Sequence, residues 1–291
     1  MKAIAFINAA AGSDASGDER RVHDALAAAG VDATVHAVDA QHLVGATQDA
    51  LTQHPDLIIA GGGDGTLSTV ASILADTGIP LGVLPLGTLN HFAKDLNLPL
   101  ELEPAARVIA ARNIHPVDLG EVNGRCFINN SSIGIYPKIV RARVEHQRLG
   151  RGKWLSLAVA VLHVFGRIPR YRVRLNLDGQ EDIRTTPFLF VGNNRYQINP
   201  SEFGGRTALD HGELCLYLAE NISRFAMLRL LLRSAIGRLE QSPHFESCYL
   251  RELWIDTGRP LVDVAIDGEV THMSTPLHYR IRPAALRVIA P

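Results

Sequence analysis

The sequence predicts an α/β domain with a parallel sheet over residues 1–117 and a mainly antiparallel β domain over residues 118–291. Three observations support this fold class. Apolar runs alternate with helical patterns in the first part, and a glycine-rich turn joins one of these runs to a helix. Strand-like runs separated by turn residues dominate the second part. Alternating strands and helices are typical of a parallel sheet that helices cover on both faces.

In chain order, the first part alternates four strands with four helices. Short apolar runs between turn residues mark the strands, and periodic apolar positions mark the helices. The predicted strands cover residues 2–7, 32–38, 56–60 and 79–84, and the predicted helices cover residues 17–29, 43–54, 66–74 and a stretch from about residue 90. Loops at residues 8–13, 61–66 and 85–90 follow three of these strands. We expect them to meet at the carboxyl edge of the sheet, where open α/β sheets bind ligands.

The turn that follows the third strand carries the strongest functional signal. It reads Gly61-Gly62-Gly63-Asp64-Gly65-Thr66. Residues without Cβ let the main chain approach a ligand, and free N–H groups at a helix start favour an anion, so the turn indicates a phosphate site. A carboxylate repels phosphate unless a cation lies between them, so Asp64 indicates a nucleotide bound with Mg²⁺. The structural alternative is a tight turn in which Asp64 caps the helix. The spacing matches neither the Walker loop nor G-x-G-x-x-G.

Turns and strand-like runs organise the second part. Asn123-Gly124 predicts a two-residue hairpin, and Asp267-Gly268 predicts another, with Glu269 exposed beside it. Further strands are predicted at residues 170–177, 183–192, 213–218, 246–256 and 261–266, and helices at residues 137–147, 154–165 and 223–239. The strand-like tail at residues 278–289 is expected to pair back onto either domain.

The composition is that of a soluble globular protein. Apolar residues make up 46% of the chain, charged residues make up 20%, and the formal charge is -1, which argues against attraction of the whole molecule to nucleic acid. Cys126, Cys215 and Cys248 are odd in number and lack metal-ligand spacing, so we expect free, mostly buried thiols in the cytoplasm. No signal peptide is expected, and the apolar runs at residues 154–168 and 227–239 are too short or too charged to span a membrane.

Positive charge is concentrated between residues 138 and 174. This segment holds ten Lys or Arg residues and one acid, Glu145, with apolar residues such as Trp154 and Phe165 among them. Such a segment favours peripheral docking on an anionic membrane, where each nearby cation contributes on the order of 1 kcal/mol. The alternative is a solvated basic helix that packs on the second domain. No RNA-binding motif accompanies the charge, so nucleic acid is not an expected partner.

Together these motifs resemble those of the diacylglycerol kinase catalytic-domain family, which includes bacterial lipid kinases and the sphingosine and ceramide kinases. The strongest matches are residues 62–66 with Val70, and residues 85–93. Weaker matches lie at residues 8–12, 117–120, 130–134, 209–214 and 266–269. The Gly-Gly-Asp-Gly-Thr element alone is shared with the NAD kinases.

The resemblance implies two domains with ATP and Mg²⁺ in the cleft between them, and transfer of the γ-phosphoryl group to a lipid hydroxyl in phospholipid metabolism. By this resemblance, the residues that hold nucleotide and phosphates are Asn8, Gly62, Gly63, Asp64, Gly65, Thr66, Gly87, Thr88 and Asn90. Asp64 and Asp118 would belong to a water-mediated Mg²⁺ network, and Glu269 would be the general base on the lipid hydroxyl.

Two histidines depart from the family pattern. His91 stands where many members have an acid, and His211 interrupts an Asp-Asp-Gly element that surrounds a structural metal in bacterial members, so no metal ligand is assigned there. Each is expected to be a structural histidine rather than a catalytic base. Two other functions stay open: a nucleotide- or lipid-binding protein with little turnover, and an NAD kinase. The sequence leaves open the lipid and the oligomeric state, a homodimer included.

Overall fold

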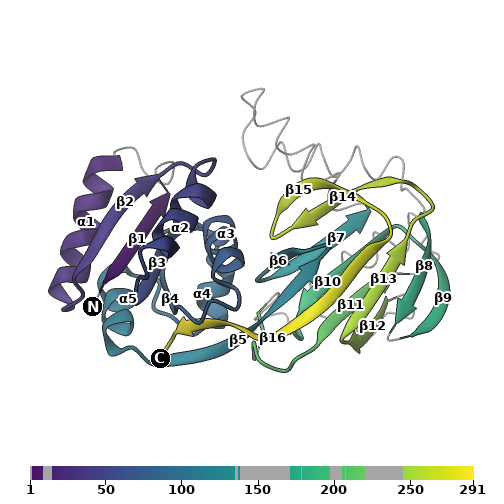
Figure 1. Ribbon diagram of the computed structural model, residues 1–291. Coiled ribbons are helices and arrows are strands. Elements are labelled where there is room, and N and C mark those ends of the chain that lie inside the picture. Colours follow the sequence, from purple (N-terminus) through teal and green to yellow (C-terminus); the bar gives the residue numbers. More distant parts are fainter. Residues whose placement is uncertain are drawn as a thin grey trace.

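The computed structural model describes residues 2–8, 15–134, 137, 171–177, 179–196, 205–206, 208–219 and 245–291. The predicted fold class is confirmed, because an α/β part with a parallel sheet precedes a mainly antiparallel β part (Figure 1). The first part contains β1 (Ala3–Asn8), α1 (Ala15–Ala28), β2 (Ala33–Val38), α2 (Leu43–Thr52), β3 (Leu57–Gly62), α3 (Asp64–Leu74), β4 (Leu81–Pro85), α4 (His91–Asp95) and α5 (Leu102–Ala111).

The strands of the first part are parallel and follow the order β2-β1-β3-β4. Successive side chains of a strand point to opposite faces, and β1 serves two cores in this way. Ala5 and Ile7 pack with α1 and α5, whereas Ile4 and Phe6 pack with α2 and α3. Helices therefore cover both faces, and the carboxyl ends of β1, β3 and β4 lie along one edge.

Two long strands join the parts. β5 (Ile114–Val122) leaves the first part, and β16 (Leu277–Ile289) returns to it along an antiparallel register with β5. β16 pairs with β4 through Val288 and with β13 (Glu252–Asp256) at its other end. The tail thus pairs with both parts, and one ten-stranded sheet runs through the molecule. The predicted boundary between residues 117 and 118 falls within β5 and stays a prediction.

The second part is a sandwich of two sheet layers. A six-stranded antiparallel sheet with the order β12-β11-β10-β7-β14-β15 faces the end of the ten-stranded sheet across a core that includes Leu175, Leu216, Leu253 and Tyr279. The remaining strands are β6 (Arg125–Phe127), β7 (Asn130–Gly134), β8 (Tyr171–Leu177), β9 (Gln180–Thr186), β10 (Phe188–Asn193), β11 (Leu214–Ala219), β12 (Phe245–Leu250), β14 (Leu261–Ile266) and β15 (Glu269–Ser274). The hairpin predicted at Asn123-Gly124 joins β5 to β6.

Two predicted strands are wrong, because each is a pair of strands in different sheets. The run at residues 183–192 breaks at Pro187, which has no N–H to donate, and Thr186 exchanges side-chain hydrogen bonds with Phe188 around it. The run at residues 246–256 breaks at Arg251, where the chain passes from β12 to β13. Each break carries the chain across the sandwich.

Other predictions differ in detail. The helix expected from about residue 90 is α4, and α5, which follows beyond Asn97 in the left-handed region, was not predicted. Strand β7 has no counterpart in the prediction, whereas β15 is the second strand of the hairpin predicted at Asp267-Gly268. The helices predicted at residues 137–147, 154–165 and 223–239 lie outside the described residues, apart from Pro137, and most of the basic segment lies there too.

Cys126, Cys215 and Cys248 are free thiols, and the first two are buried, as expected. Among the residues with a described structure, none of the helices combines the length and apolar character that crossing a membrane requires.

Candidate active site

The glycine turn links the end of β3 to the start of α3. Gly63 has an extended main chain and precedes Asp64, the first residue of α3, while Gly63, Asp64 and Gly65 all keep part of their surface exposed. The first N–H groups of a helix lack intrahelical acceptors and carry the positive end of its dipole. Gly63, Asp64 and Gly65 are thus partly accessible at the start of α3, while Gly62 and Thr66 beside them are buried. That the main-chain donors of this turn hold a phosphate stays a prediction.

The loop after β4 lies directly against this turn. A Cβ added to Gly87 would lie 2.4 Å from the Cα of Gly63, so the two loops touch at a distance that only glycine allows. Asn90, which is buried and has a left-handed main chain, accepts from the N–H of Gly87 and donates to the carbonyls of Pro85 and Gly87. These bonds give the loop its shape and leave Thr88 exposed.

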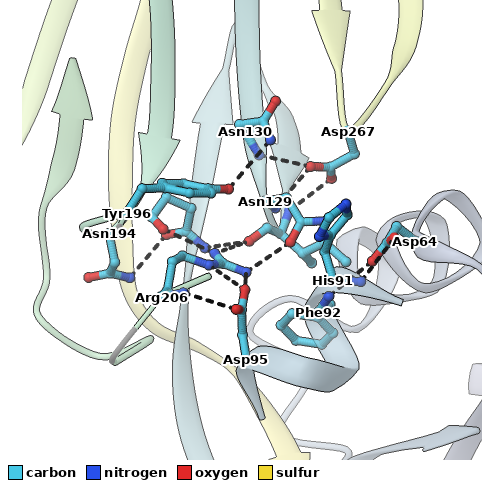
Figure 2. Close-up of polar contacts among 12 residues, drawn as sticks. Asp64, His91, Phe92, Asp95, Asn129, Asn130, Asn194, Tyr196, Arg206 and Asp267 are labelled. Carbon is cyan, nitrogen blue, oxygen red and sulfur yellow. Dashed lines mark hydrogen bonds and ion pairs between the residues drawn. The ribbon is translucent and has the colours of Figure 1, made fainter. Parts of the chain in front are cut away.

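Asp64 connects the turn to α4. Its carboxylate accepts hydrogen bonds from the main-chain N–H groups of His91, at 3.2 Å, and Phe92, at 3.0 Å (Figure 2). Asp64 therefore caps α4, and Gly63, not Asp64, is the N-cap residue of its own helix. The His91 side chain is exposed at the start of α4, rather than packed in the core.

Glu269 faces the glycine turn from the second part. It is exposed and is the first residue of β15, and a Cβ on Gly65 would lie 3.4 Å from its Oε1 atom. The predicted Asp267-Gly268 hairpin precedes it, with both residues at positive φ, as two-residue hairpins favour. The sequence thus predicted correctly that Glu269 lies beside the turn.

Asp267 has a structural role that the sequence did not indicate. Its carboxylate accepts from the hydroxyl of Ser68 in α3 and from the main-chain N–H groups of Ile128, Asn129 and Asn130. Desolvation raises the pKa of this carboxyl, and the four hydrogen bonds oppose that shift. One side chain therefore joins α3, the connection between β6 and β7, and the hairpin that carries Glu269.

Asp118 lies in β5, where the paired strands β5 and β16 pass from one part of the chain to the other. It is 2% exposed, and its carboxylate accepts from the N–H groups of Gly212, at 2.7 Å, and Ala284, at 2.8 Å. Ala284 lies in the bulge that shifts the register of β5 and β16. In the described part of the chain, these hydrogen bonds hold Asp118 to the bulge and to Gly212, not to the glycine turn.

A buried arginine that the sequence analysis did not single out ties α4 to the second part. The guanidinium of Arg206 is 0% exposed and donates to the Asp95 carboxylate, to the carbonyls of Ile128 and Asn193, and to the side chain of Asn129. Figure 2 shows this cluster beside Asp267 and Asp64.

Paired asparagines surround the arginine. Asn129 lies between β6 and β7, Asn130 begins β7, and Asn193-Asn194 lie at the end of β10. Asn130 donates to the hydroxyl of Tyr196, and desolvation raises the pKa of Tyr196 to about 12. The two Asn-Asn pairs beside apolar strands are the sequence signal that could have indicated a buried polar cluster, because buried amides need hydrogen-bond partners.

The residues around the glycine turn suit a phosphate group better than a directly bound metal ion. A Cβ on Gly63 would lie 3.6 Å from the Cα of Gly87, and a Cβ on Gly65 would lie 3.4 Å from the Oε1 atom of Glu269. Both positions are bare main chain, which is what the close approach of a phosphate group requires. Asn8 ends β1 next to β3 on the same sheet edge, and the loop after it is outside the described residues. Over the described ranges, no group of three or more His, Cys, Asp or Glu side chains could hold a metal ion.

Comparison with known proteins shows the family of both parts of the chain. Residues 2–122 match the diacylglycerol kinase catalytic domain, and residues 132–290 match the YegS C-terminal NAD kinase β-sandwich-like domain. A Mycobacterium tuberculosis protein named diacylglycerol kinase is 30% identical over 266 residues, which cover 87% of this chain and 82% of the relative. A Pseudomonas aeruginosa protein named probable lipid kinase YegS-like is 39% identical over 259 residues, with the same coverages.

A solved structure has the same fold. The crystal structure of a diacylglycerol kinase from Bacillus anthracis is 23% identical, with a TM-score of 0.72, and the match covers 100% of this chain and 97% of that one. Both family matches, the identities and the fold lead to one conclusion. The chain belongs to the diacylglycerol kinase catalytic-domain family of lipid kinases.

Proposed function

We propose that this lipid kinase transfers the γ-phosphoryl group of ATP to a hydroxyl group of a diacylglycerol-like or sphingoid lipid. The observation that carries the proposal is the position of Glu269, whose Oε1 lies 3.4 Å from where a Cβ on Gly65 would be. Phosphoryl transfer to an alcohol needs a site that aligns and neutralises phosphate charge, together with a carboxylate that can take the hydroxyl proton. The names of the relatives support a lipid as the acceptor.

The proposed step uses groups from both parts of the chain. The lipid hydroxyl oxygen forms a bond to the γ-phosphorus, and its proton passes to the Glu269 carboxylate. The bond from the γ-phosphorus to the oxygen that bridges to the β-phosphate breaks, and ADP leaves with that electron pair. Main-chain N–H groups at Gly63 to Gly65 hold the phosphates, and the exposed Thr88 extends this contact from the neighbouring loop.

Mg²⁺, when bound with the nucleotide, would neutralise phosphate charge. Asp64 is the acid of the turn, and each of its oxygens accepts one main-chain N–H and has further acceptor capacity. We therefore assign Asp64 both to capping α4 and to contacting cation-bound water. The assignment of Asp118 to the same network is a proposal that rests on the family resemblance, because its hydrogen bonds serve the strand crossing.

A kinase assay tests the proposal directly. The protein is incubated with γ-labelled ATP and Mg²⁺, with vesicles that contain a diacylglycerol or a sphingoid base, and with NAD in a separate reaction. We expect labelled lipid from the wild type and a loss of about 10²-fold or more in Glu269→Gln. Glu181→Gln is the matched control, because Glu181 is also exposed in a β-hairpin, the one formed by β8 and β9. No labelled lipid from the wild type, or equal rates from both variants, would refute the proposal.

Two alternatives give different results in this assay. Labelling of NAD alone would identify an NAD kinase. Tight ATP binding without phosphoryl transfer would identify a binding protein with little turnover, and a gain of transfer in His91→Asp would support this alternative. His91 is the residue to change because it lies exposed at the start of α4, beside Asp64.

We also propose that the acceptor lipid is reached at an anionic membrane surface. Arg172 and Arg174 of the basic segment are exposed on β8, and residues 138–170 of that segment lie outside the described residues. Sedimentation with vesicles of rising anionic lipid content measures this association. A bound fraction that does not rise with anionic lipid content, or does not fall with added salt, would contradict the proposal.

A further inference from the structure

The Asp267 carboxylate connects the β14–β15 hairpin, which carries Glu269, to α3, the helix that starts at the glycine turn. One oxygen, Oδ2, accepts from the Ser68 hydroxyl at 2.5 Å and from the Ile128 N–H at 2.9 Å. The other, Oδ1, accepts from the N–H groups of Asn129, at 2.8 Å, and Asn130, at 3.0 Å. These three main-chain N–H groups can only donate. Both side-chain oxygens of residue 267 must therefore be acceptors, as they are in an ionised aspartate.

Ser68 supplies the link to the first part. It lies one turn after Asp64 in α3, is 8% exposed, and is 199 residues from Asp267 in sequence. A rigid helix relates the Ser68 hydroxyl to the N–H groups of its own first turn. The hydrogen bond to Asp267 therefore fixes the hairpin relative to the place where the phosphates are proposed to bind.

The hairpin transmits this position to Glu269. Asp267 and Gly268 are the two central residues of the turn, at φ 45 and 87, and Ile266 pairs with Glu269 across it. The N–H of Asp267 donates to the carbonyl of Asn130, so main chain and side chain hold the turn at both ends. Little main-chain freedom therefore separates the anchored Asp267 carboxylate from the backbone that carries Glu269.

We propose that Asp267, through Ser68, is the positioning residue that holds Glu269 over the first turn of α3. This inference rests on the proposed phosphoryl transfer and adds to it a residue that acts through another. Alignment of reacting groups is the main source of catalysis in phosphoryl transfer, and a displacement of about 1 Å can cost on the order of 10²-fold in rate.

A matched pair of serine variants tests the proposal. Ser68→Ala removes the bond to Asp267, whereas Ser72→Ala removes a hydroxyl one turn later in α3 that donates to the carbonyls of Ser68 and Cys126. Both variants lose a bond from α3 to the second part, but only Ser68 contacts the hairpin. We expect kcat to fall about 10-fold in Ser68→Ala with KM for ATP within about twofold, and to stay unchanged in Ser72→Ala. Ser68→Thr, which restores the hydroxyl, should recover most of the rate.

A second measurement does not depend on turnover. Hydrogen exchange of the peptide that spans residues 261–274 should become faster in Ser68→Ala and stay unchanged in Ser72→Ala. Asp267→Asn, which places an amide NH₂ against main-chain donors, should show the larger increase and a loss of about 10²-fold in kcat.

The possible failures are distinguishable. A wild type without lipid kinase activity refutes the proposed function, while hydrogen exchange still tests the position of the hairpin. An active wild type with equal kcat in Ser68→Ala and Ser72→Ala, or a Ser68→Ala variant with unchanged exchange at residues 261–274, overturns the role of Asp267.

Discussion

Breaking the buried ion pair of Arg206 and Asp95 should destabilise the fold far more than breaking an exposed ion pair at the same interface. Asp95→Asn is the perturbation. The side chains of Arg206 and Asp95 are 0% and 4% exposed, and the Asp95 carboxylate also accepts from the main-chain N–H of Arg206. The substitution leaves a buried guanidinium without its counter-charge and turns one acceptor into a donor. Breaking a buried pair in this way costs about 3–5 kcal/mol, a large share of the 5–15 kcal/mol that is typical of total stability.

Asp76→Asn is the matched control. Asp76 also lies in the first part and forms an ion pair with an arginine of the second, Arg282, but its side chain is 62% exposed. Its main chain is in the left-handed region, which asparagine tolerates well. Exposed pairs contribute about 0–1 kcal/mol, so the control should change the free energy of unfolding by no more than that.

Urea denaturation followed by tryptophan fluorescence and by circular dichroism measures both variants. Coincident transitions define one free energy of unfolding for the two parts together. Because Arg206 joins the parts, Asp95→Asn should lower the midpoint strongly. A loss below about 1 kcal/mol, or one equal to that of Asp76→Asn, would refute the reasoning that burial makes this pair important.

Three further predictions concern single sites. Gly87→Ala brings a Cβ to 2.4 Å from the Cα of Gly63, so ATP affinity measured by calorimetry should fall at least about 10-fold. Gly45→Ala, in α2, meets nothing within 4 Å and should leave the affinity unchanged, and equal affinities would contradict the close approach of the two loops. Burial raises the pKa of Cys126 and, to about 12, that of Cys215, so a thiol reagent at pH 8 should modify only Cys248 rapidly and the other two after unfolding. Hydrogen bonds from His278 and Trp254 lower the pKa of Glu252, so its contribution to stability is present above the ordinary carboxyl pKa and is lost as pH falls through the lowered value. The difference in urea midpoint between wild type and Glu252→Gln should therefore close in acid, and a constant difference would contradict the shift.

Local patterns were sufficient to predict the elements that depend on their own residues. The apolar run before Gly61 and the glycines after it predicted a strand, a turn and a helix start, and Asn123-Gly124 predicted a hairpin, because each signal is contained in a few residues. The same patterns could not separate β9 from β10. Both are extended and partly apolar, and only Pro187 marks the point at which the chain changes sheets.

In the site, too, residues marked by a local pattern were predicted, and residues defined by distant contacts were not. Glu269 and the glycine turn were predicted, and the structure places them together. Asp267 was interpreted only as a turn residue, since its partner Ser68 is 199 residues away and no local pattern records such a contact. Arg206 was not considered for the same reason: Asp95 lies 111 residues before it. Asp64 was expected to act toward Mg²⁺, and the hydrogen bonds that it forms to α4 give it an additional structural role.

These contacts make α3 the element that relates the two parts of the site. Along its length, Asp64 contacts α4, Ser68 contacts the hairpin that carries Glu269, and Ser72 contacts β6. α4 is held in turn by Asp95 and Arg206, and the main-chain pairing of β5 with β16 spans the same interface. A hinge motion between the parts would have to break several of these contacts at once, including a buried ion pair. We therefore expect the glycine turn and Glu269 to be held in place before substrate binds, so that catalysis depends on an alignment that the folded chain already has.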